Sequence, residues 1–253
     1  MKTILFGIIL SFVTLISVAQ NVIVVDTSAI VPPNNVKFNY KQIIIPTVLI
    51  GYGFVGLNSG DLKRINLDIR DEVVANVHQQ TNIDDYLEFT PALSVYALNA
   101  LGVNGKHNFK DRTVILATTW LFVNVTVKSL KSITKINRPN NSNDDAFPSG
   151  HTAMAFAGAE FLYQEYKDQS VWYGIAGYVT AATTGVLRIY NNKHWLTDVV
   201  AGAGFGMLST KAAYWLSPFM NKHIIPSMSG KATAMFMPTF DGKQLGGAFV
   251  MSF

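Results

Sequence analysis

Three short segments of this 253-residue chain combine positive charges with imidazole, carboxylate and hydroxyl groups. In chain order they hold Lys131 and Arg138-Pro139, then Pro148-Ser149-Gly150-His151, then Arg188, His194 and Asp198. Lysine and arginine bind phosphoryl oxygens through charge-assisted hydrogen bonds. An imidazole oriented by a carboxylate can act as a base or a nucleophile. The residue types therefore predict a site for a phosphate-like group.

The third segment holds the predicted nucleophile. His194 and Asp198 are four residues apart, so we expect them on one face of the last helix, with the carboxylate accepting a hydrogen bond from one ring nitrogen. The other nitrogen would then be free to attack phosphorus. Lys131, Arg138 and Arg188 are expected to bind the phosphoryl oxygens and to stabilise the charge of the transition state.

The second segment is predicted to begin a helix. Ser149 and Gly150 would lie where free backbone N–H groups favour an anion, and glycine lets the backbone approach closely. His151, in the first turn, would protonate the leaving oxygen. This scheme uses neither a metal nor a cofactor. Asp144 and Asp145 are adjacent loop residues with no third ligand nearby in the sequence, so we expect solvated turn residues and assign them no role.

Apolar spacing predicts the elements that position these segments, and the fold class is all-α, a bundle of about six helices. The predicted helices cover residues 61–80, 91–101, 113–130, 152–166, 171–187 and 195–216, after an apolar run at 43–57. If consecutive helices run up and down, all three segments meet at one end of the bundle. Alternating apolar residues between 231 and 253 predict a short C-terminal β-hairpin.

The two ends of the chain differ in composition from the bundle. Lys2, the apolar stretch Ile4 to Ile16 and Ser17-Val18-Ala19 are typical of a cleaved signal peptide, which predicts export to the bacterial cell envelope. The expected organisation is a signal peptide at 1–19, a lead-in with N-terminal helices at 20–84, a core at 85–216 and a tail with the hairpin at 217–253.

The three segments resemble the type 2 phosphatidic acid phosphatase superfamily, which includes bacterial class A acid phosphatases and vanadium haloperoxidases. That signature is Lys, six residues, Arg-Pro; then Pro-Ser-Gly-His; then Ser-Arg, five residues, His, three residues, Asp. Every spacing is matched here, over roughly residues 85–216. One position departs, since Leu187 precedes Arg188 where the family usually has Ser or Thr.

The resemblance implies a metal-independent phosphatase that hydrolyses phosphate monoesters or pyrophosphates through a phosphohistidine. A lipid-linked phosphate is the leading substrate class, with a small phosphate ester as the substrate if the chain is a soluble periplasmic acid phosphatase. A vanadate-dependent haloperoxidase and an inactive envelope scaffold rank lower, because haloperoxidases are usually much larger and buried charges are costly without a use.

Composition bounds the partners and the location. Only 14% of the residues are charged, and the scattered Lys and Arg form no basic stripe, so no nucleic-acid partner is expected. Four apolar runs, at 43–57, 113–127, 171–187 and 199–216, are slightly shorter than the roughly 20 residues of a membrane span. The low charge favours membrane association with a periplasmic active site, and a soluble periplasmic domain is the alternative.

Overall fold

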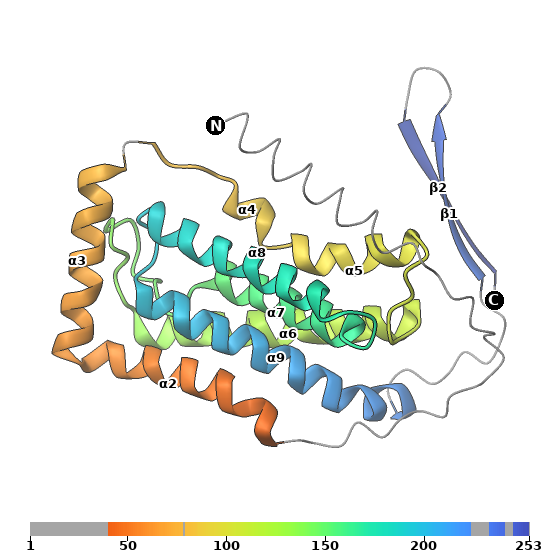
Figure 1. The fold of residues 1–253 in the computed structure, drawn as a ribbon, viewed down its shortest axis with the longest axis horizontal. Coiled ribbons are helices and arrows are strands. Elements are labelled where there is room, and N and C mark those ends of the chain that lie inside the picture. The colour runs from red at the N-terminus through yellow and green to blue at the C-terminus, as the bar shows by residue number, and fades with distance from the viewer. Residues whose placement is uncertain (1–39, 78, 224–232, 241–244, 253) are drawn as a thin grey trace. The chain divides into compact units, whose positions relative to one another are not determined.

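The structure is a computed structural model that describes residues 40–77, 79–223, 233–240 and 245–252 (Figure 1). The described helices are η1 (Tyr40–Ile43), α2 (Ile44–Asn58), α3 (Gly60–Asn76), α4 (Asp84–Leu87), α5 (Thr90–Ala100), α6 (Phe109–Thr134), α7 (Gly150–Tyr166), α8 (Val171–Tyr190) and α9 (Leu196–His223). The predicted signal peptide and most of the lead-in lie outside the described residues. Over the described helical part of the chain, the predicted all-α class is confirmed.

Side-chain caps fix where several of these helices begin. Asn108 Oδ1 accepts a hydrogen bond from the Asp111 backbone N–H at 2.9 Å before α6, and Ser170 Oγ accepts one from the Trp172 N–H at 3.4 Å before α8. At the other end of α6, Lys135 has a left-handed backbone with φ 46°, which ends the helix. The chain then leaves α6 directly into the loop that holds Arg138.

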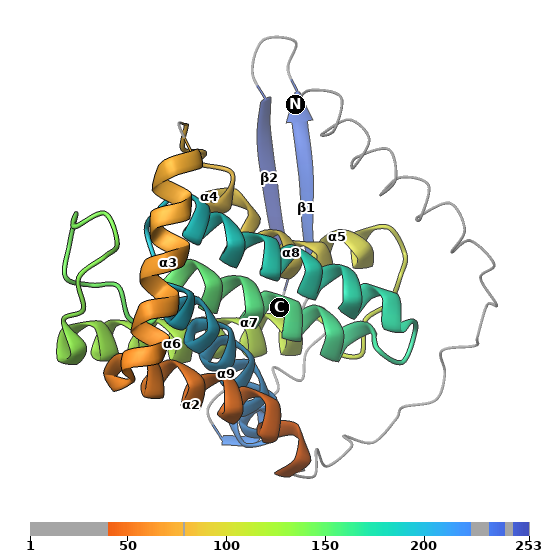
Figure 2. The same ribbon diagram turned by 60° about the vertical axis from the view of Figure 1, so that its left-hand side comes forward.

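Helix α7 lies at the centre of the bundle and contacts α5, α6, α8 and α9 (Figures 1 and 2). Its buried positions are largely small, which lets neighbouring backbones come close. A Cβ atom added at Gly206 of α9 would lie 2.1 Å from the Ala153 carbonyl oxygen of α7. The packing of α7 against α9 therefore depends on glycine at this position.

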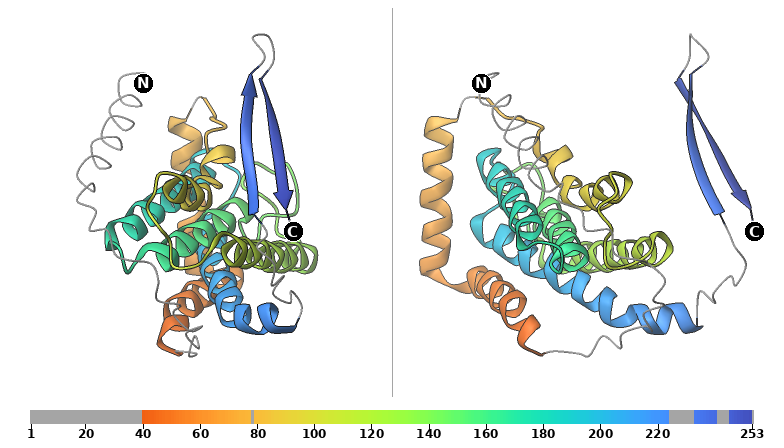
Figure 3. Two further views of the ribbon diagram at one scale, coloured as in Figure 1. Left: turned by 90° about the vertical axis from the view of Figure 1, so that its right-hand side faces the viewer. Right: turned by 45° about the vertical axis from the view of Figure 1, so that its right-hand side comes forward.

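Helices α2 and α3 complete the described bundle. Helix α2 packs along α9, where a Cβ atom at Gly53 would lie 2.4 Å from Ala201 Cβ. Helix α3 contacts both α8 and α9 and lies across one end of the bundle (Figure 3). Buried Asn66 of α3 donates a hydrogen bond from Nδ2 to Thr197 Oγ1 at 2.9 Å. This contact joins α3 to the first turn of α9.

One described helix differs from the sequence-based prediction. Helix α4 was not predicted, because four residues carry no helical period. The C-terminal segments β1 (Thr233–Phe240) and β2 (Leu245–Ser252) have an antiparallel register, and the C-terminal hairpin stays a prediction.

Two described helical stretches are long and apolar enough to cross a membrane: Tyr40–Asn58 and Phe109–Thr134. They contain two of the four predicted apolar runs. Within their most apolar windows, 17% and 33% of the residues are buried in the protein. Most residues of these windows are therefore not fully buried, and several large apolar side chains on both helical stretches are exposed.

Candidate active site

The three segments meet at one end of the bundle, where α6 ends, α7 begins, α8 ends and α9 begins. Two hydrogen bonds to main-chain oxygens tie the second segment and the loop before it to the third: the Ser149 N–H donates to the Asp198 carbonyl oxygen at 3.0 Å, and His194 Nδ1 bonds the Ala146 carbonyl oxygen at 2.8 Å. The structure thus brings all eight predicted site residues to the same end, as the up-and-down arrangement required.

Lys131 and Arg138 share one carboxylate. Lys131 Nζ lies 3.3 Å from Asp145 Oδ2, and Arg138 donates from Nε to Oδ1 at 2.8 Å and from Nη2 to Oδ2 at 3.2 Å. Burial alone raises the pKa of Asp145, but the hydrogen bonds from Arg138 and the charge of Lys131 outweigh it and hold that pKa below its usual value. The prediction that Asp145 is only a solvated turn residue was wrong.

Arg188 is buried and held by a second acidic residue. Its Nη1 pairs with Asp84 Oδ2 in α4 and lies 3.8 Å from Asp85 Oδ1. Asn191 supports the pair by donating from Nδ2 to Asp84 Oδ1 at 2.9 Å. The buried Nε of Arg188 has no hydrogen-bond partner among the described residues. A donor of this guanidinium therefore remains to bind an anion.

His194 is almost completely buried, with 2% of its surface exposed, and lies in the turn before α9 rather than on that helix. Its Nδ1 lies 2.8 Å from the Ala146 carbonyl oxygen and 3.6 Å from Asp198 Oδ2. Because a carbonyl oxygen can only accept, Nδ1 carries the hydrogen and Nε2 is the basic nitrogen. The predicted hydrogen bond from the ring to Asp198 was therefore wrong, because the main-chain carbonyl oxygen of Ala146 accepts the hydrogen bond from Nδ1.

The surroundings keep His194 neutral. Burial lowers its pKa well below the usual value, and the positive charges of Arg188, Lys131 and Arg138 lower it further. Asp198 Oδ2 instead accepts a hydrogen bond from the Trp195 backbone N–H at 2.8 Å, and Oδ1 is buried without a partner among the described residues. Burial raises the pKa of Asp198 to about 7, although the Trp195 hydrogen bond and the charges of Lys131 and Arg138 oppose this. A neutral imidazole with a free Nε2 thus lies close to three cations and one buried carboxyl group.

Ser149 and Gly150 begin α7 as predicted, although Ser149 acts differently. Its N–H is used by the Asp198 carbonyl oxygen, and its hydroxyl lies 2.9 Å from Thr152 Oγ1 instead of capping the helix. The first-turn amides that follow are the ones without helical partners. A Cβ atom at Gly150 would meet only Val127 Cγ1, at 3.6 Å, so protein atoms do not require glycine here.

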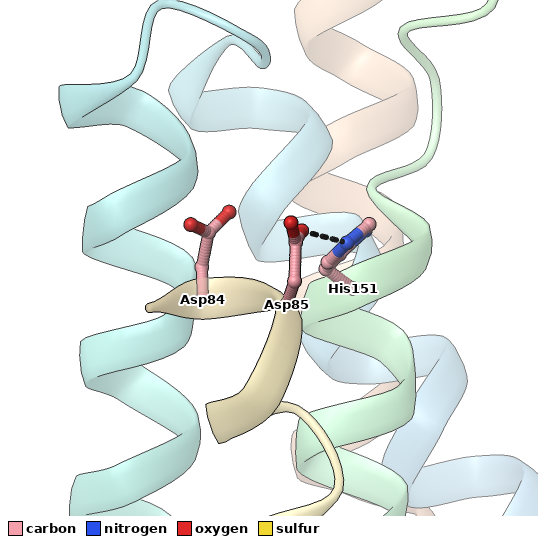
Figure 4. Close-up of side chains that lie close together, drawn as sticks. All are labelled: Asp84, Asp85 and His151. Carbon is pink, nitrogen blue, oxygen red and sulfur yellow. Dashed lines mark hydrogen bonds and ion pairs between the residues drawn. The ribbon is translucent and has the colours of Figure 1, made fainter. Parts of the chain in front are cut away.

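His151 contacts the acidic α4 segment at the wall of a cavity of ≈ 280 Å³. Its Nε2 lies 2.9 Å from Asp85 Oδ1 (Figure 4) and 3.7 Å from Glu88 Oε1. The cavity is lined by charged residues of both signs, namely Asp84, Asp85, Arg138, His151, Arg188 and Lys193. The sequence-based prediction did not place Asp84, Asp85 or Glu88 in the site. The adjacent acidic residues Asp84 and Asp85 were the available signal.

One group of side chains at this cavity has the spacing of metal ligands. One ligand atom each from Asp84, Asp85 and His151 lie within 4.8 Å of one another (Figure 4). The Arg188 guanidinium already pairs with Asp84 and lies near Asp85, so a fixed organic cation neutralises these carboxylates. The donors therefore fit an arginine-centred network better than a metal, and we assign no metal to it.

Residues 112–222 match the family model described as the PAP2 superfamily. These residues belong to that superfamily. The matched PAP2 region contains all three segments, from Lys131 to Asp198, and the central helix α7. The resemblance inferred from the motif spacing is thereby confirmed for this part of the chain.

Two curated relatives match parts of this chain. Lipid A 1-phosphatase of Porphyromonas gingivalis is 34% identical over 142 residues, which cover 54% of this chain and 31% of that protein. Bacitracin transport permease protein BcrC of Bacillus licheniformis is 31% identical over 97 residues, 38% of this chain and 46% of that protein. The chain thus spans between about a third and a half of the length of these relatives.

Two solved structures are similar to part of this chain. LpxE of Aquifex aeolicus has a TM-score of 0.45 at 23% identity, over 59% of this chain and 94% of that chain. A transmembrane PAP2 type phosphatidylglycerolphosphate phosphatase of Bacillus subtilis has a TM-score of 0.44 at 18% identity, over 71% of this chain and 98% of that chain.

Proposed function

We propose that this chain is a phosphatase that hydrolyses phosphate monoesters or pyrophosphates through a phosphohistidine on His194. The observation that carries the proposal is the state of the His194 ring: Nδ1 bonds the Ala146 carbonyl oxygen, so Nε2 is unprotonated and near the cations. An oriented neutral imidazole is a competent nucleophile toward phosphorus.

The other site residues have distinct roles in this proposal. Lys131, Arg138 and Arg188 bind the three non-bridging oxygens and stabilise their charge in the transition state. The free amides at the start of α7 add neutral donors. His151 protonates the leaving oxygen, and after the phosphohistidine forms it takes a proton from the attacking water.

Asp198 has an electrostatic role rather than an orienting one. When His194 Nε2 bonds to phosphorus, the ring gains a positive charge. The Asp198 carboxylate, 3.6 Å from Nδ1, stabilises that charge. Its buried position strengthens the interaction because water screens it little.

We further propose that the substrate is lipid-linked and that the site faces the periplasm. The partly exposed apolar stretches Tyr40–Asn58 and Phe109–Thr134 support membrane association, and the predicted signal peptide supports export. The name of the P. gingivalis relative, a lipid A phosphatase, suggests the same substrate class for this chain. A lipid held by the bilayer would present its phosphate to the cavity beside α4.

A phosphate-release assay on the purified protein in detergent tests the function. Phosphatidate, a prenyl pyrophosphate, lipid A and nitrophenyl phosphate are compared with EDTA present throughout. We expect release from at least one lipid phosphate, and inhibition by vanadate, which occupies the cation cradle as a phosphoryl mimic. Release from soluble esters alone would contradict the lipid substrate, and loss with EDTA restored by a divalent ion would contradict the metal-free mechanism.

A further inference from the structure

The α4 segment places a carboxylate against the imidazole at the start of α7. His151 Nε2 lies 2.9 Å from Asp85 Oδ1, with Glu88 Oε1 at 3.7 Å. The next residue, Asp84, is 1% exposed and already engaged by Arg188 and Asn191. These two contacts of Asp84 hold α4 in place, and they therefore also fix the position of the next residue, Asp85. The arrangement has the geometry of an acid–imidazole pair.

We propose that Asp85 is a positioning residue for His151: it holds the Nε2–H and favours the protonated ring, so that His151 can act as the general acid. The inference rests on the proposed phosphatase function and extends it to a segment outside the PAP2 region, which begins at residue 112. Asp85 itself does not touch the reacting atoms and acts through the histidine.

The proton and electron movements balance as follows. His194 Nε2 forms a bond to phosphorus while the bond between phosphorus and the leaving oxygen breaks, and that electron pair stays on the oxygen. The oxygen takes a proton from His151, and because Asp85 holds Nε2–H, the transferred proton comes from Nδ1. Water then attacks phosphorus, gives its proton back to His151 Nδ1, and the phosphorus–nitrogen electron pair returns to His194.

The charged groups around His151 have opposite effects on its pKa, so the contribution of Asp85 affects how many rings are protonated. Burial lowers the pKa of His151 and the Arg188 charge lowers it further, whereas the hydrogen bond and charge of Asp85, with the charge of Asp84, raise it; together these effects leave the pKa below its usual value. The charged groups that face the ring are Asp84, Asp85 and Glu88 from α4 and the turn after it, Arg188 from α8, and Arg138 and Lys193 at the cavity wall. Without Asp85, fewer rings would carry the proton at a given pH.

The test compares Asp85→Asn and Asp85→Glu with wild type on a short-chain phosphatidate and on nitrophenyl phosphate. An alkoxide leaves poorly without a proton, whereas nitrophenolate is stable as an anion. General acid catalysis contributes about 10² to 10⁴-fold, so we expect kcat on phosphatidate to fall about 10²-fold in Asp85→Asn and kcat on nitrophenyl phosphate to fall less than about tenfold. Asp85→Glu should recover much of the loss.

The pH dependence gives a readout that a merely structural role would not move. The general acid must be protonated, so activity on phosphatidate falls as the pH rises through the pKa of His151. Removing the Asp85 charge lowers that pKa, and the alkaline limb of the kcat profile should shift to lower pH. Asp168→Asn is the matched control, since it removes a carboxylate from the turn after α7, about 25 Å along that helix from His151.

The outcomes separate this inference from the proposed function. A wild-type protein without activity on any phosphate ester would overturn both. A second result is an active wild type together with an Asp85→Asn variant that loses the same factor in kcat on both substrates, or that keeps the alkaline limb of its pH profile where the wild type has it. Either observation on Asp85→Asn would overturn the role of Asp85 and leave the proposed phosphatase function intact. For Asp85→Asn we expect a loss of kcat that is larger on phosphatidate than on nitrophenyl phosphate, together with an alkaline limb shifted to lower pH. Asp168→Asn should show neither change.

Discussion

Carboxylates neutralise every predicted phosphate-binding cation in this structure. Asp145 bridges Lys131 and Arg138, and Asp84 pairs with Arg188. A bound phosphate ester therefore competes with protein carboxylates for the same donors. The Arg188 Nε, which is buried and lacks a partner among the described atoms, is a donor of this guanidinium that no ion pair occupies.

His194→Ala should abolish turnover and remove any acid-labile phosphoenzyme. In the proposed mechanism, its Nε2 is the nitrogen that bonds to phosphorus, and a methyl group cannot replace it. Rapid quench with a ³²P-labelled substrate measures the intermediate, with wild type as the reference. Label retained on the variant protein would contradict the assignment of the nucleophile.

Asp198→Asn should slow phosphoenzyme formation by about 10²-fold. Where a carboxylate alone fixes the tautomer of a catalytic histidine, its loss costs about 10⁴-fold. Here the Ala146 carbonyl oxygen fixes the tautomer, so only the charge at 3.6 Å is lost. Single-turnover kinetics measure the step, and a loss near 10⁴-fold would mean that Asp198 takes the Nδ1 proton during the reaction.

At the level of elements, α4 and the turn after it carry a carboxyl whose ionisation is coupled to folding. Burial raises the pKa of Glu88 from 4.5 to about 7; the Arg188 charge opposes this and the Asp85 and Asp84 charges add to it. The folded protein therefore binds this proton more tightly than the unfolded chain. Its stabilising contribution is complete below about pH 4.5 and is lost as the pH rises through about 7.

Glu88→Gln should therefore stabilise the protein selectively at alkaline pH. The amide cannot ionise, so the cost of a buried charge disappears at pH 8.5, while at pH 5 the protonated acid and the amide are nearly equivalent. Thermal unfolding in detergent at both values measures the difference in Tm, with Asp168→Asn as a surface control. A difference in Tm that does not change with pH would contradict the raised pKa.

Helix contacts built on glycine predict a second effect at this scale. Gly206→Ala places a Cβ atom 2.1 Å from the Ala153 carbonyl oxygen, so α9 and α7 must separate, at a cost of about 1–3 kcal/mol. Gly51→Ala, in α2, meets no atom within 4 Å and gains helix propensity of up to about 1 kcal/mol. Thermal unfolding of the two variants should give Tm shifts of opposite sign; equal shifts would contradict close packing at Gly206.

For the whole molecule, the sequence predicted what depends on local spacing. Six helices and the convergence of three motif segments followed from helical period and from alternating helix direction. The roles of Asp84, Asp85 and Asp145 did not, because their partners are between 7 and 107 residues away along the chain. A four-residue helix and a single loop carboxylate leave no periodic pattern, and their positions depend on tertiary packing.

A second buried charged cluster lies away from the site, and its partners are seen only in the three-dimensional structure. Glu160 is fully buried and accepts hydrogen bonds from Lys211, Gln164 and Tyr178. These partners lie on α7, α8 and α9. Breaking such a pair by removing one partner is strongly destabilising because it leaves an uncompensated charge, so this cluster accounts for both Lys211 and Glu160 without a catalytic role.

The main-chain hydrogen bond from Ser149 to the Asp198 carbonyl oxygen has a practical consequence. It joins the start of α7 to the first turn of α9 without using any side chain that the proposed chemistry consumes. A variant that lacks the nucleophile, such as His194→Ala, should therefore keep the pocket assembled and still hold its substrate. Such a protein, purified from its host membrane and extracted into organic solvent, would carry its natural lipid with it, and mass spectrometry of the extract would give that molecule its chemical identity.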